Sequence, residues 1–565
     1  MTIVSRAYAL LAGLSPATSR RVGVERGIAI PMPDGVVLRA DRWFPDEAGG
    51  DRAPILLAMS PYGRSDVKVP YGRLGAERGY QALIVSARGS FGSGGQWVPF
   101  RDAQADGAAV LDWLSEQPWF SGRVGTVGGS YLGFTQWAVA KEPPSWLQAM
   151  APAVTTGNMQ RMAYPSAGAF ALESALTWLG GLEHQERPLP QAVMHAVHTM
   201  RGVRAAADRL PLFEVDLAMV GRQVPWFQDW LVHDTQDDHW WVEIDGSRAV
   251  ETTPPASMVA GWYDLFLAAQ LDDFRRLKAA GRCVRLTVGP WTHNSPGNGA
   301  AGLRDTFDWM GEHLRGTRSA RSASSRVRVF VLGARCWVDL PDWPPTAETT
   351  HWHLHPDGRL STEPPPESAP DRYRYDPADP TPSVGGPSLN AATGGCKDNR
   401  RLEARPDVLT YTTGSLAEDL TVIGDVTAEL YVRSSLEHTD FFVRLCDVAP
   451  SGRSSNLCDG IVRLTPKSVE KRGDGSLRVR VRLFPTANTF LRGHRIRLQV
   501  SSGAHPLYAR NTGSGEPLGK ATTLVAADQE VFHDPARASR IELPVVSAVG
   551  PVRGHHRRFR AEGRS

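Results

Sequence analysis

At residues 124–133 the chain reads VGTVGGSYLG: a short apolar strand, a glycine pair, Ser130 and the start of a helix. A sharp turn between a strand and a helix strains the residue at its apex, so the neighbouring residues must be small. Such a turn also places the serine hydroxyl at a helix N-terminus, where backbone N–H groups can stabilise an oxyanion. The pattern predicts a nucleophilic serine. The alternative is a glycine-rich turn that carries an incidental serine.

Short apolar runs alternate with amphipathic stretches on both sides of this turn. Strands are predicted over 53–60, 82–87, 123–127, 256–261, 284–288 and 327–332. Helices are predicted over 102–117, 131–140 and 266–279. Alternating strands and helices indicate the α/β class, with a mostly parallel sheet that helices cover on both faces.

Two further regions differ from this pattern. The first lacks strand patterns and is rich in tryptophan and in apolar residues at helical spacing. The second follows a Pro- and acid-rich stretch, 341–387, which reads as a linker; beyond it apolar residues and arginines alternate with a period of two, as in 477–483. We therefore predict a mostly parallel α/β core of residues 20–155 and 249–345, a helical insertion at 156–248, and an all-β domain over 346–550 that is a β-sandwich or a jelly roll.

Composition narrows the function classes. The chain has 565 residues, 41% of them hydrophobic and 22% charged, which suits about three folded domains. The net charge of +3 argues against nucleic acid as a partner. No apolar run approaches the ~18 residues that span a bilayer, so no membrane association is expected. The five scattered cysteines contain no CxxC pair, which favours a reducing compartment, the cytoplasm.

A serine nucleophile needs a base, and the base needs a carboxylate to orient it. In α/β-hydrolases these follow the serine in the order acid, then histidine, each after a later strand. Asp264, in GWYD at 261–264, and His293, in GPWTH at 289–293, have this order and these positions. Together they favour a catalytic pair over a helix N-cap and a loop histidine.

An oxyanion also needs hydrogen-bond donors. Tyr62 follows the strand 53–60, where an oxyanion loop belongs, and its phenol could donate beside the N–H of Tyr131. A turn tyrosine is the alternative. No metal is predicted, because the histidines at 351, 353 and 355 have no nearby carboxylate or cysteine to complete a site.

At these residues the sequence resembles the CocE/NonD (cocaine esterase-like) family of serine hydrolases, in the X-Pro dipeptidyl-peptidase S15 group. That group also holds α-amino acid ester hydrolases and glutaryl acylases. GGSYLG at 128–133 fits the family's G-x-S-Y-x-G elbow, and the segments around Tyr62, Asp264 and His293 match its oxyanion, acid and histidine segments. Ser86 departs from the family, in which Asp often precedes the Arg-Gly loop, and this difference is expected to affect loop packing.

The resemblance implies the α/β class with an α/β-hydrolase core, a helical cap inserted at 156–248 and a C-terminal all-β jelly-roll domain. It also implies a role for each of these residues. Ser130 would be the nucleophile, His293 the base and Asp264 the orienting acid, while Tyr62 and the Tyr131 N–H would form the oxyanion hole. Phe266 and Trp178 are expected to line the substrate pocket.

The same resemblance implies the reaction. We expect a small-molecule acyl ester or amide to be cleaved through an acyl-enzyme without a cofactor, with an esterase of the cocaine esterase type favoured. An X-Pro dipeptidyl-peptidase, an acyltransferase and, least favoured, a non-catalytic binding protein stay open, as does a homodimer.

The residues after Asp264 bear on the substrate. An enzyme that requires a free α-amino group must hold a carboxylate against that ammonium, since an unpaired buried charge is costly. Residues 265–269 read LFLAA, and no acid follows until Asp272. We therefore expect uncharged acyl esters to be preferred, unless Glu173, Glu183 or Glu186 of the cap supplies a carboxylate.

Overall fold

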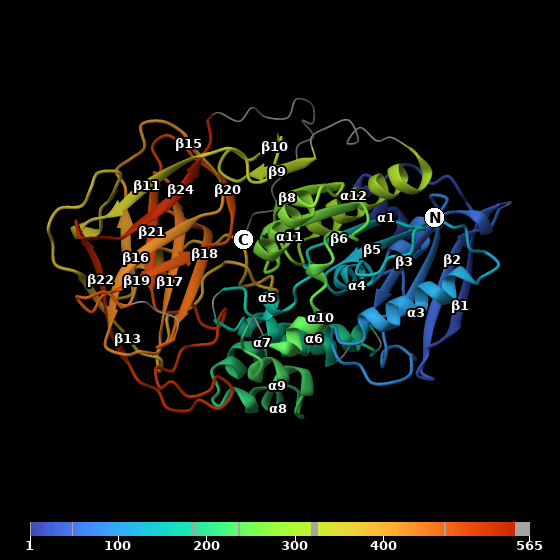
Figure 1. Cartoon of the computed structure of the whole chain (residues 1–565), viewed down its shortest axis with the longest axis horizontal. Helices are drawn as coiled ribbons and strands as arrows, with labels where there is room; N and C mark the ends of the chain where they lie inside the picture. The colour runs from blue at the N-terminus through green and yellow to red at the C-terminus, as the bar shows by residue number, and fades with distance from the viewer. Residues whose placement is uncertain are drawn as a thin grey trace.

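The computed structural model describes residues 2–47, 49–166, 168–183, 185–187, 189–235, 238–317, 326–467 and 471–547. Three parts are visible in Figure 1: an α/β core, a group of helices along one side of it, and an all-β domain drawn in yellow to red. The helices come from an insertion between the sixth and seventh strands of the core. This arrangement confirms the predicted α/β-hydrolase core with a helical cap and a C-terminal all-β domain.

The core is a sheet in the order β1-β2-β4-β3-β5-β6-β7-β8-β9-β10. Its strands are β1 (Val22–Pro31), β2 (Val37–Pro45), β3 (Ile55–Ser60), β4 (Gln81–Ser86), β5 (Val124–Gly129), β6 (Leu147–Ala153), β7 (Ala256–Tyr263), β8 (Val284–Thr292), β9 (Val327–Val331) and β10 (Cys336–Leu340). All neighbouring pairs from β4 to β9 are parallel, whereas β1, β2 and β10 pair antiparallel. Because parallel strands end at the same edge of a sheet, loops that follow β3, β5, β7 and β8 meet there.

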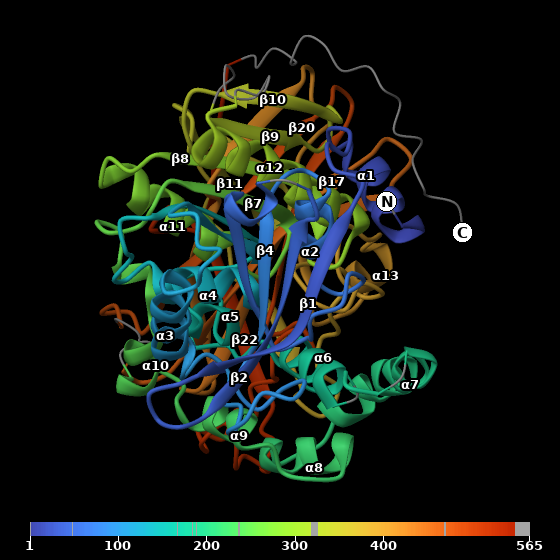
Figure 2. The same cartoon turned by 90° about the vertical axis from the view of Figure 1, so that its right-hand side faces the viewer.

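Helices cover both faces of the sheet. They are α1 (Ile3–Ala12), α2 (Tyr71–Ala76), α3 (Ala103–Ser115), α4 (Tyr131–Val139), α11 (Leu267–Ala279) and α12 (Pro296–Arg315). Residues of α1, α2 and α12 share one apolar cluster, and those of α3, α4 and α11 belong to clusters on the other face. Figure 2 shows α3 and α4 on one side of the strands and α1 and α2 on the other.

The cap consists of six α-helices within the described residues, five of them short. They are α5 (Gln160–Ala163), α6 (Leu172–Glu183), α7 (Leu189–Ala207), α8 (Val215–Val220), α9 (Pro225–Val232) and α10 (His239–Ile244). Aromatic side chains of α6, α9 and α10, including Trp178, Trp226 and Trp230, join one cluster with Tyr131 and Phe266 of the core. The cap is therefore attached to the core through the residues that surround the serine turn.

The C-terminal domain is built from antiparallel strands in two sheets. Its elements are β11 (Glu348–Leu354), β12 (Leu360–Ser361), β13 (Asp371–Tyr375), α13 (Arg400–Glu403), β14 (Leu409–Thr412), β15 (Leu420–Gly424), β16 (Thr427–Ser434), β17 (Thr439–Val448), β18 (Ser454–Leu464), β19 (Leu477–Arg482), β20 (Thr486–Phe490), β21 (Arg495–Ser501), β22 (Ala527–Asp534), β23 (Arg537–Ala538) and β24 (Arg540–Val545). The smaller sheet has the order β14-β21-β17-β18. As the alternation predicts, Val479 and Val481 of β19 are buried and the arginines between them are exposed. The jelly-roll connection stays a prediction.

The predicted linker at 341–387 is wrong. This stretch contributes β11, β12 and β13 to the larger sheet of the β domain. β11 pairs with β24 and β13 with β22, strands more than 150 residues later in the chain. Proline and acidic residues between these short strands give the stretch the composition of a linker. Its strands pair only with residues far away in the chain, so the local sequence does not indicate them.

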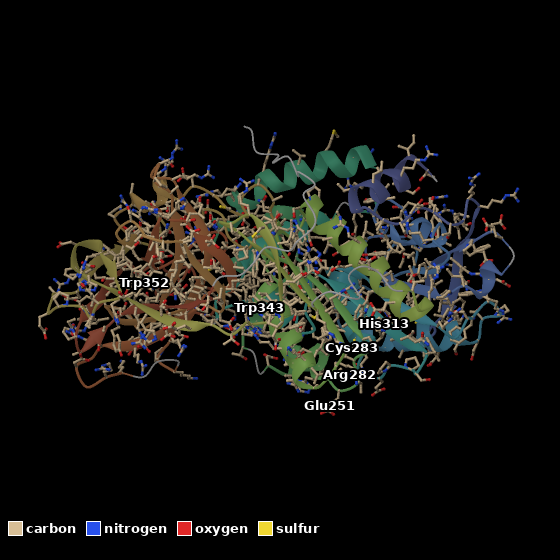
Figure 3. The ribbon with its side chains drawn as sticks, turned by 90° about the horizontal axis from the view of Figure 1, so that it is seen from above. Glu251, Arg282, Cys283, His313, Trp343 and Trp352 are labelled. Atoms are coloured by element: carbon tan, nitrogen blue, oxygen red, sulfur yellow. The ribbon has the colours of Figure 1, made fainter. Side chains whose placement is uncertain are left out.

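The β domain and the core share one hydrophobic cluster. Residues of β7, α11 and β8 belong to the same cluster as buried residues of β16, β17 and β21. Trp343, after β10, packs on Trp262 of β7 with ring centroids 5.8 Å apart. Figure 3 shows Trp343 between the two parts and Trp352 farther out on the β domain. The two parts therefore bury apolar surface against each other.

Candidate active site

Ser130 occupies a strained turn between β5 and α4. Its φ is 57° and its ψ is −124°, a conformation that side-chain-bearing residues rarely adopt. A Cβ at Gly128 would lie 2.4 Å from the Leu132 Cβ, and one at Gly133 would lie 2.4 Å from the Thr155 Cγ2. The glycines of the sequence pattern are therefore required by close packing on both sides of the serine.

The turn presents Ser130 at the N-terminus of α4. Its carbonyl accepts hydrogen bonds from the N–H groups of Gly133 and Phe134, which starts the helix. The Tyr131 N–H belongs to the first turn of α4, whose N–H groups have no intrahelical partner. A donor is thus available beside the serine hydroxyl.

Asp264 and His293 are joined by a hydrogen bond. The two residues follow β7 and β8, neighbouring parallel strands. His293 Nδ1 lies 2.7 Å from Asp264 Oδ2, and both side chains are buried. The other carboxylate oxygen, Oδ1, accepts from the Phe266 N–H at 2.8 Å, and the Asn298 side chain donates to the His293 carbonyl at 2.8 Å. The imidazole is therefore held by its Nδ1 edge, which leaves Nε2 for another partner.

Tyr62 lies in the loop after β3, and the side chain of Ser130 is close enough to its phenol to affect the pKa of Tyr62. The Trp178 indole N–H donates to the same phenol oxygen at 3.1 Å. Burial raises the pKa of Tyr62, and the Trp178 and Ser130 side chains lower it. The net pKa is about 12. The phenol therefore keeps its proton at neutral pH and can donate it to a developing negative charge.

Two aromatic residues predicted for the substrate pocket lie at this site. The Phe266 ring packs against the His293 imidazole with centroids 5.6 Å apart. Trp178 stacks on Tyr131 at 6.5 Å. The structure thus connects Ser130, Tyr62 and Trp178 in one group, and His293, Asp264 and Phe266 in another, at the same edge of the sheet.

Sequence reasoning missed Trp97 and Phe100. The Trp97 indole N–H donates to the Tyr131 hydroxyl at 3.2 Å, and the Phe100 ring stacks on Tyr131 at 5.0 Å. Phe100 also has a positive φ of 72°. Two aromatic residues directly after the glycine-rich loop at 89–95 were the signal that could have indicated them.

The departure at Ser86 is accommodated by an arginine. Arg64 donates to the Ser86 hydroxyl and the Phe91 carbonyl, and it pairs with Asp41 at 3.0 Å. These bonds attach the loop of Tyr62 to the neighbouring strands. The Ser86 hydroxyl therefore serves as an acceptor for Arg64.

The described residues offer neither a metal site nor a membrane span. Their histidines, cysteines and acidic residues form no group of three or more that could hold a metal ion. Within the same residues, every helix is too short or too polar to cross a bilayer.

Comparisons with known proteins agree with this geometry. Residues 34–295 match the family model described as X-Pro dipeptidyl-peptidase (S15 family), and residues 320–542 match that of the X-Pro dipeptidyl-peptidase C-terminal non-catalytic domain. The cocaine esterase of Rhodococcus sp. (strain MB1 Bresler) is 35% identical, over 93% of this chain and 98% of that protein.

Two solved structures share the fold. An α-amino acid ester hydrolase is 23% identical with a TM-score of 0.76, over 94% of this chain and 98% of that one. An aminopeptidase from the marine sediment archaeon Thaumarchaeota archaeon is 23% identical with a TM-score of 0.75, over 93% of this chain and 96% of that one. Three named activities thus occur on one architecture.

Proposed function

Because this chain belongs to the S15 family of serine hydrolases, the group of X-Pro dipeptidyl-peptidases and cocaine esterase, we propose that it is an esterase that uses Ser130, His293 and Asp264. The observation that carries this proposal is the buried hydrogen bond between Asp264 and His293 at 2.7 Å, at the sheet edge where Ser130 occupies its strained turn. The order of the three residues along the chain is that of an α/β-hydrolase triad.

In the proposed mechanism His293 accepts the hydroxyl proton of Ser130 at Nε2. The serine oxygen attacks the ester carbonyl, and Asp264 stabilises the imidazolium through Nδ1. The tetrahedral intermediate collapses to an acyl-enzyme when His293 returns the proton to the leaving alcohol. Water then attacks the acyl carbonyl as His293 takes one of its protons. The bond to the Ser130 oxygen breaks as His293 returns this proton to that oxygen, which releases the carboxylic acid and restores Ser130.

The oxyanion is assigned to two donors. The Tyr131 N–H lies beside Ser130 at the start of α4, and the Tyr62 phenol is close enough to the Ser130 side chain for that side chain to affect its pKa. Because Trp178 donates to the phenol oxygen, the phenol proton is directed elsewhere, and a substrate oxyanion can receive it.

The acyl group is proposed to be uncharged. The acids that could have held a substrate ammonium already have partners. Glu186 accepts a hydrogen bond from the Phe91 N–H at 2.7 Å. Glu173 accepts hydrogen bonds from Ser388 and Thr393, and Glu183 pairs with Arg222. Burial raises the pKa of Asp272, but a hydrogen bond from Arg482 and the charge of Arg161 outweigh this effect and lower the pKa to about 2. Phe266 and Trp178 leave an aromatic lining suited to aromatic or short aliphatic acyl groups.

Further parts of the proposal concern the setting of the enzyme. A small-molecule substrate without a cofactor and a location in the cytoplasm are proposed. All five cysteines are unpaired thiols, which supports a reducing compartment. A homodimer and a lack of nucleic-acid partners stay predictions from the sequence.

An X-Pro dipeptidyl-peptidase is the second candidate, since the family model carries that description. The test is a side-by-side measurement of kcat/KM for a series of p-nitrophenyl acyl esters and for Gly-Pro and Ala-Pro p-nitroanilides. We expect the benzoyl and short aliphatic esters to be preferred. Preference for the dipeptidyl anilides would replace the esterase proposal, and transfer of the acyl group to an added alcohol in place of water would indicate an acyltransferase.

A further inference from the structure

Glu173 is a buried carboxylate in the first turn of α6. Its side chain accepts from the Ser388 hydroxyl at 2.7 Å, the Thr393 hydroxyl at 2.7 Å and the Asn390 amide at 3.5 Å. The residue is only 2% exposed. A buried charge is costly unless hydrogen bonds satisfy it, so these contacts form a specific site. All three donors come from one segment of the β domain, residues 388–393.

This segment continues to the catalytic histidine. The Leu389 N–H donates to the Ser174 hydroxyl of α6 at 3.4 Å, and the Leu389 carbonyl accepts from the Asn294 side chain at 3.0 Å. Asn294 directly follows His293. Leu389 therefore lies between the cap helix and the histidine loop, and its side chain packs against the cluster that contains Phe266.

The middle of the same helix reaches the oxyanion tyrosine. Trp178, five residues after Glu173 in α6, donates its indole N–H to Tyr62. The carboxylate also lies in the first turn of the helix, where the helix dipole favours negative charge. One helix thus contacts the β domain through Glu173 and the oxyanion loop through Trp178.

We propose that Glu173 is a positioning residue: it fixes segment 388–393 of the β domain against α6 and the His293 loop, so that Leu389 forms a wall of the acyl pocket. This inference rests on the proposed esterase function. Without the carboxylate, the three donors lose their common acceptor, and the wall shifts relative to His293. A substrate that fills the pocket should then suffer more than a substrate that does not.

The experiment measures kcat and KM of Glu173→Ala with p-nitrophenyl benzoate and p-nitrophenyl acetate, together with the rate at which a fluorophosphonate labels Ser130. We expect kcat/KM for the benzoate to fall about 10- to 100-fold, mainly through KM, because a misplacement of about 1 Å can cost that much. The acetate reaction and the labelling rate should change much less. Glu173→Gln keeps an acceptor oxygen and should recover most of the loss.

Glu183→Ala is the matched control. Glu183 ends the same helix but pairs with Arg222 at the surface, at 2.8 Å, and this variant should match the wild type. If Glu173→Ala does not fold, Thr393→Val replaces it, since that change removes one donor from the other side of the contact. It should show the same selective rise in KM to a smaller degree.

Unchanged benzoate kinetics in the folded variants would overturn the proposal. So would equal losses for both esters and for labelling, which indicate a merely structural role. A wild-type enzyme that neither hydrolyses these esters nor reacts with the fluorophosphonate would instead contradict the esterase function, so the two failures are distinguishable.

Discussion

At the scale of single residues, the contacts of Tyr62 keep the proton on its phenol oxygen and orient it. Its ring packs edge-on against Tyr131 at 6.4 Å, and its oxygen accepts from Trp178. Burial holds its pKa at about 12, so the phenol remains a donor. This environment distinguishes Tyr62 from a solvent-facing turn tyrosine.

Tyr62→Phe should therefore lower kcat by about 10²–10³-fold, the usual effect of removing one oxyanion donor. The ring and its packing remain, so the melting temperature should change little. The measurement is kcat for a p-nitrophenyl ester beside Tyr71→Phe, a buried tyrosine of the α2 cluster that serves as control. Full activity of Tyr62→Phe would assign the donor to another group.

The pKa of Tyr62 also predicts a pH profile. A phenol loses its donor proton as the pH rises through its pKa, which is about 12 here, compared with about 10 for an ordinary tyrosine. We therefore expect kcat/KM to show no loss attributable to Tyr62 between about pH 8 and about pH 11. The wild type and Tyr62→Phe should give profiles of the same shape, and an alkaline fall confined to the wild type would contradict this.

At the scale of elements, the strands with strong local patterns could be predicted and those without could not. β3, β4, β5, β7 and β8 agree with the predicted strands to within a few residues, because their apolar runs are continuous. β6 and α12 were missed: β6 reads LQAMAPA, and α12 begins PGNGAAG, in which glycine and proline hide the helix. β11 and β13 were missed because their partners lie far away in the chain.

The residues of the candidate site also divide into those that the local sequence indicates and those that it does not. Asp264 and His293 could be found because each follows a recognisable strand. The contacts of Trp97 with the Tyr131 hydroxyl and of Glu173 with the 388–393 segment could not be predicted, because these residues come together only in the fold. The order of strands along the chain predicts where a loop lies. Contacts between side chains of different domains can be identified only from the tertiary structure.

Trp178 of helix α6 is expected to act through the Tyr62 phenol. Trp178→Phe removes the indole N–H and keeps an aromatic ring, so the Tyr62 phenol loses its orienting donor. We expect kcat to fall about tenfold, which corresponds to about 1.4 kcal/mol, within the range for one hydrogen bond. In a Tyr62→Phe background the same change should have little effect. Additive losses in this double-mutant cycle would show that Trp178 acts independently of Tyr62.

At the scale of the whole molecule, the β domain is part of the folded enzyme. It shares a hydrophobic cluster with β7, α11 and β8 and contacts the histidine loop through Leu389. Arg482 of β19 also pairs with Asp272 of α11 at 2.9 Å. Core and β domain therefore stabilise each other, and the β domain reaches the loop of His293.

A chain truncated at Pro341 should accordingly be insoluble or inactive, because it exposes the apolar surface that the β domain covers in the full chain. Solubility and esterase activity of the truncated and full-length chains provide the measurement. A soluble truncation with full activity would show that the β domain is an independent appendage.

The central claim, that Ser130 is the nucleophile, is tested most directly by the kcat of Ser130→Ala with the best p-nitrophenyl ester. The change removes one hydroxyl from the turn between β5 and α4, so the variant should fold like the wild type. We predict a loss of about 10⁶-fold in kcat, as for removal of the nucleophile from a serine protease. Turnover at the wild-type rate in a folded Ser130→Ala enzyme would contradict the account.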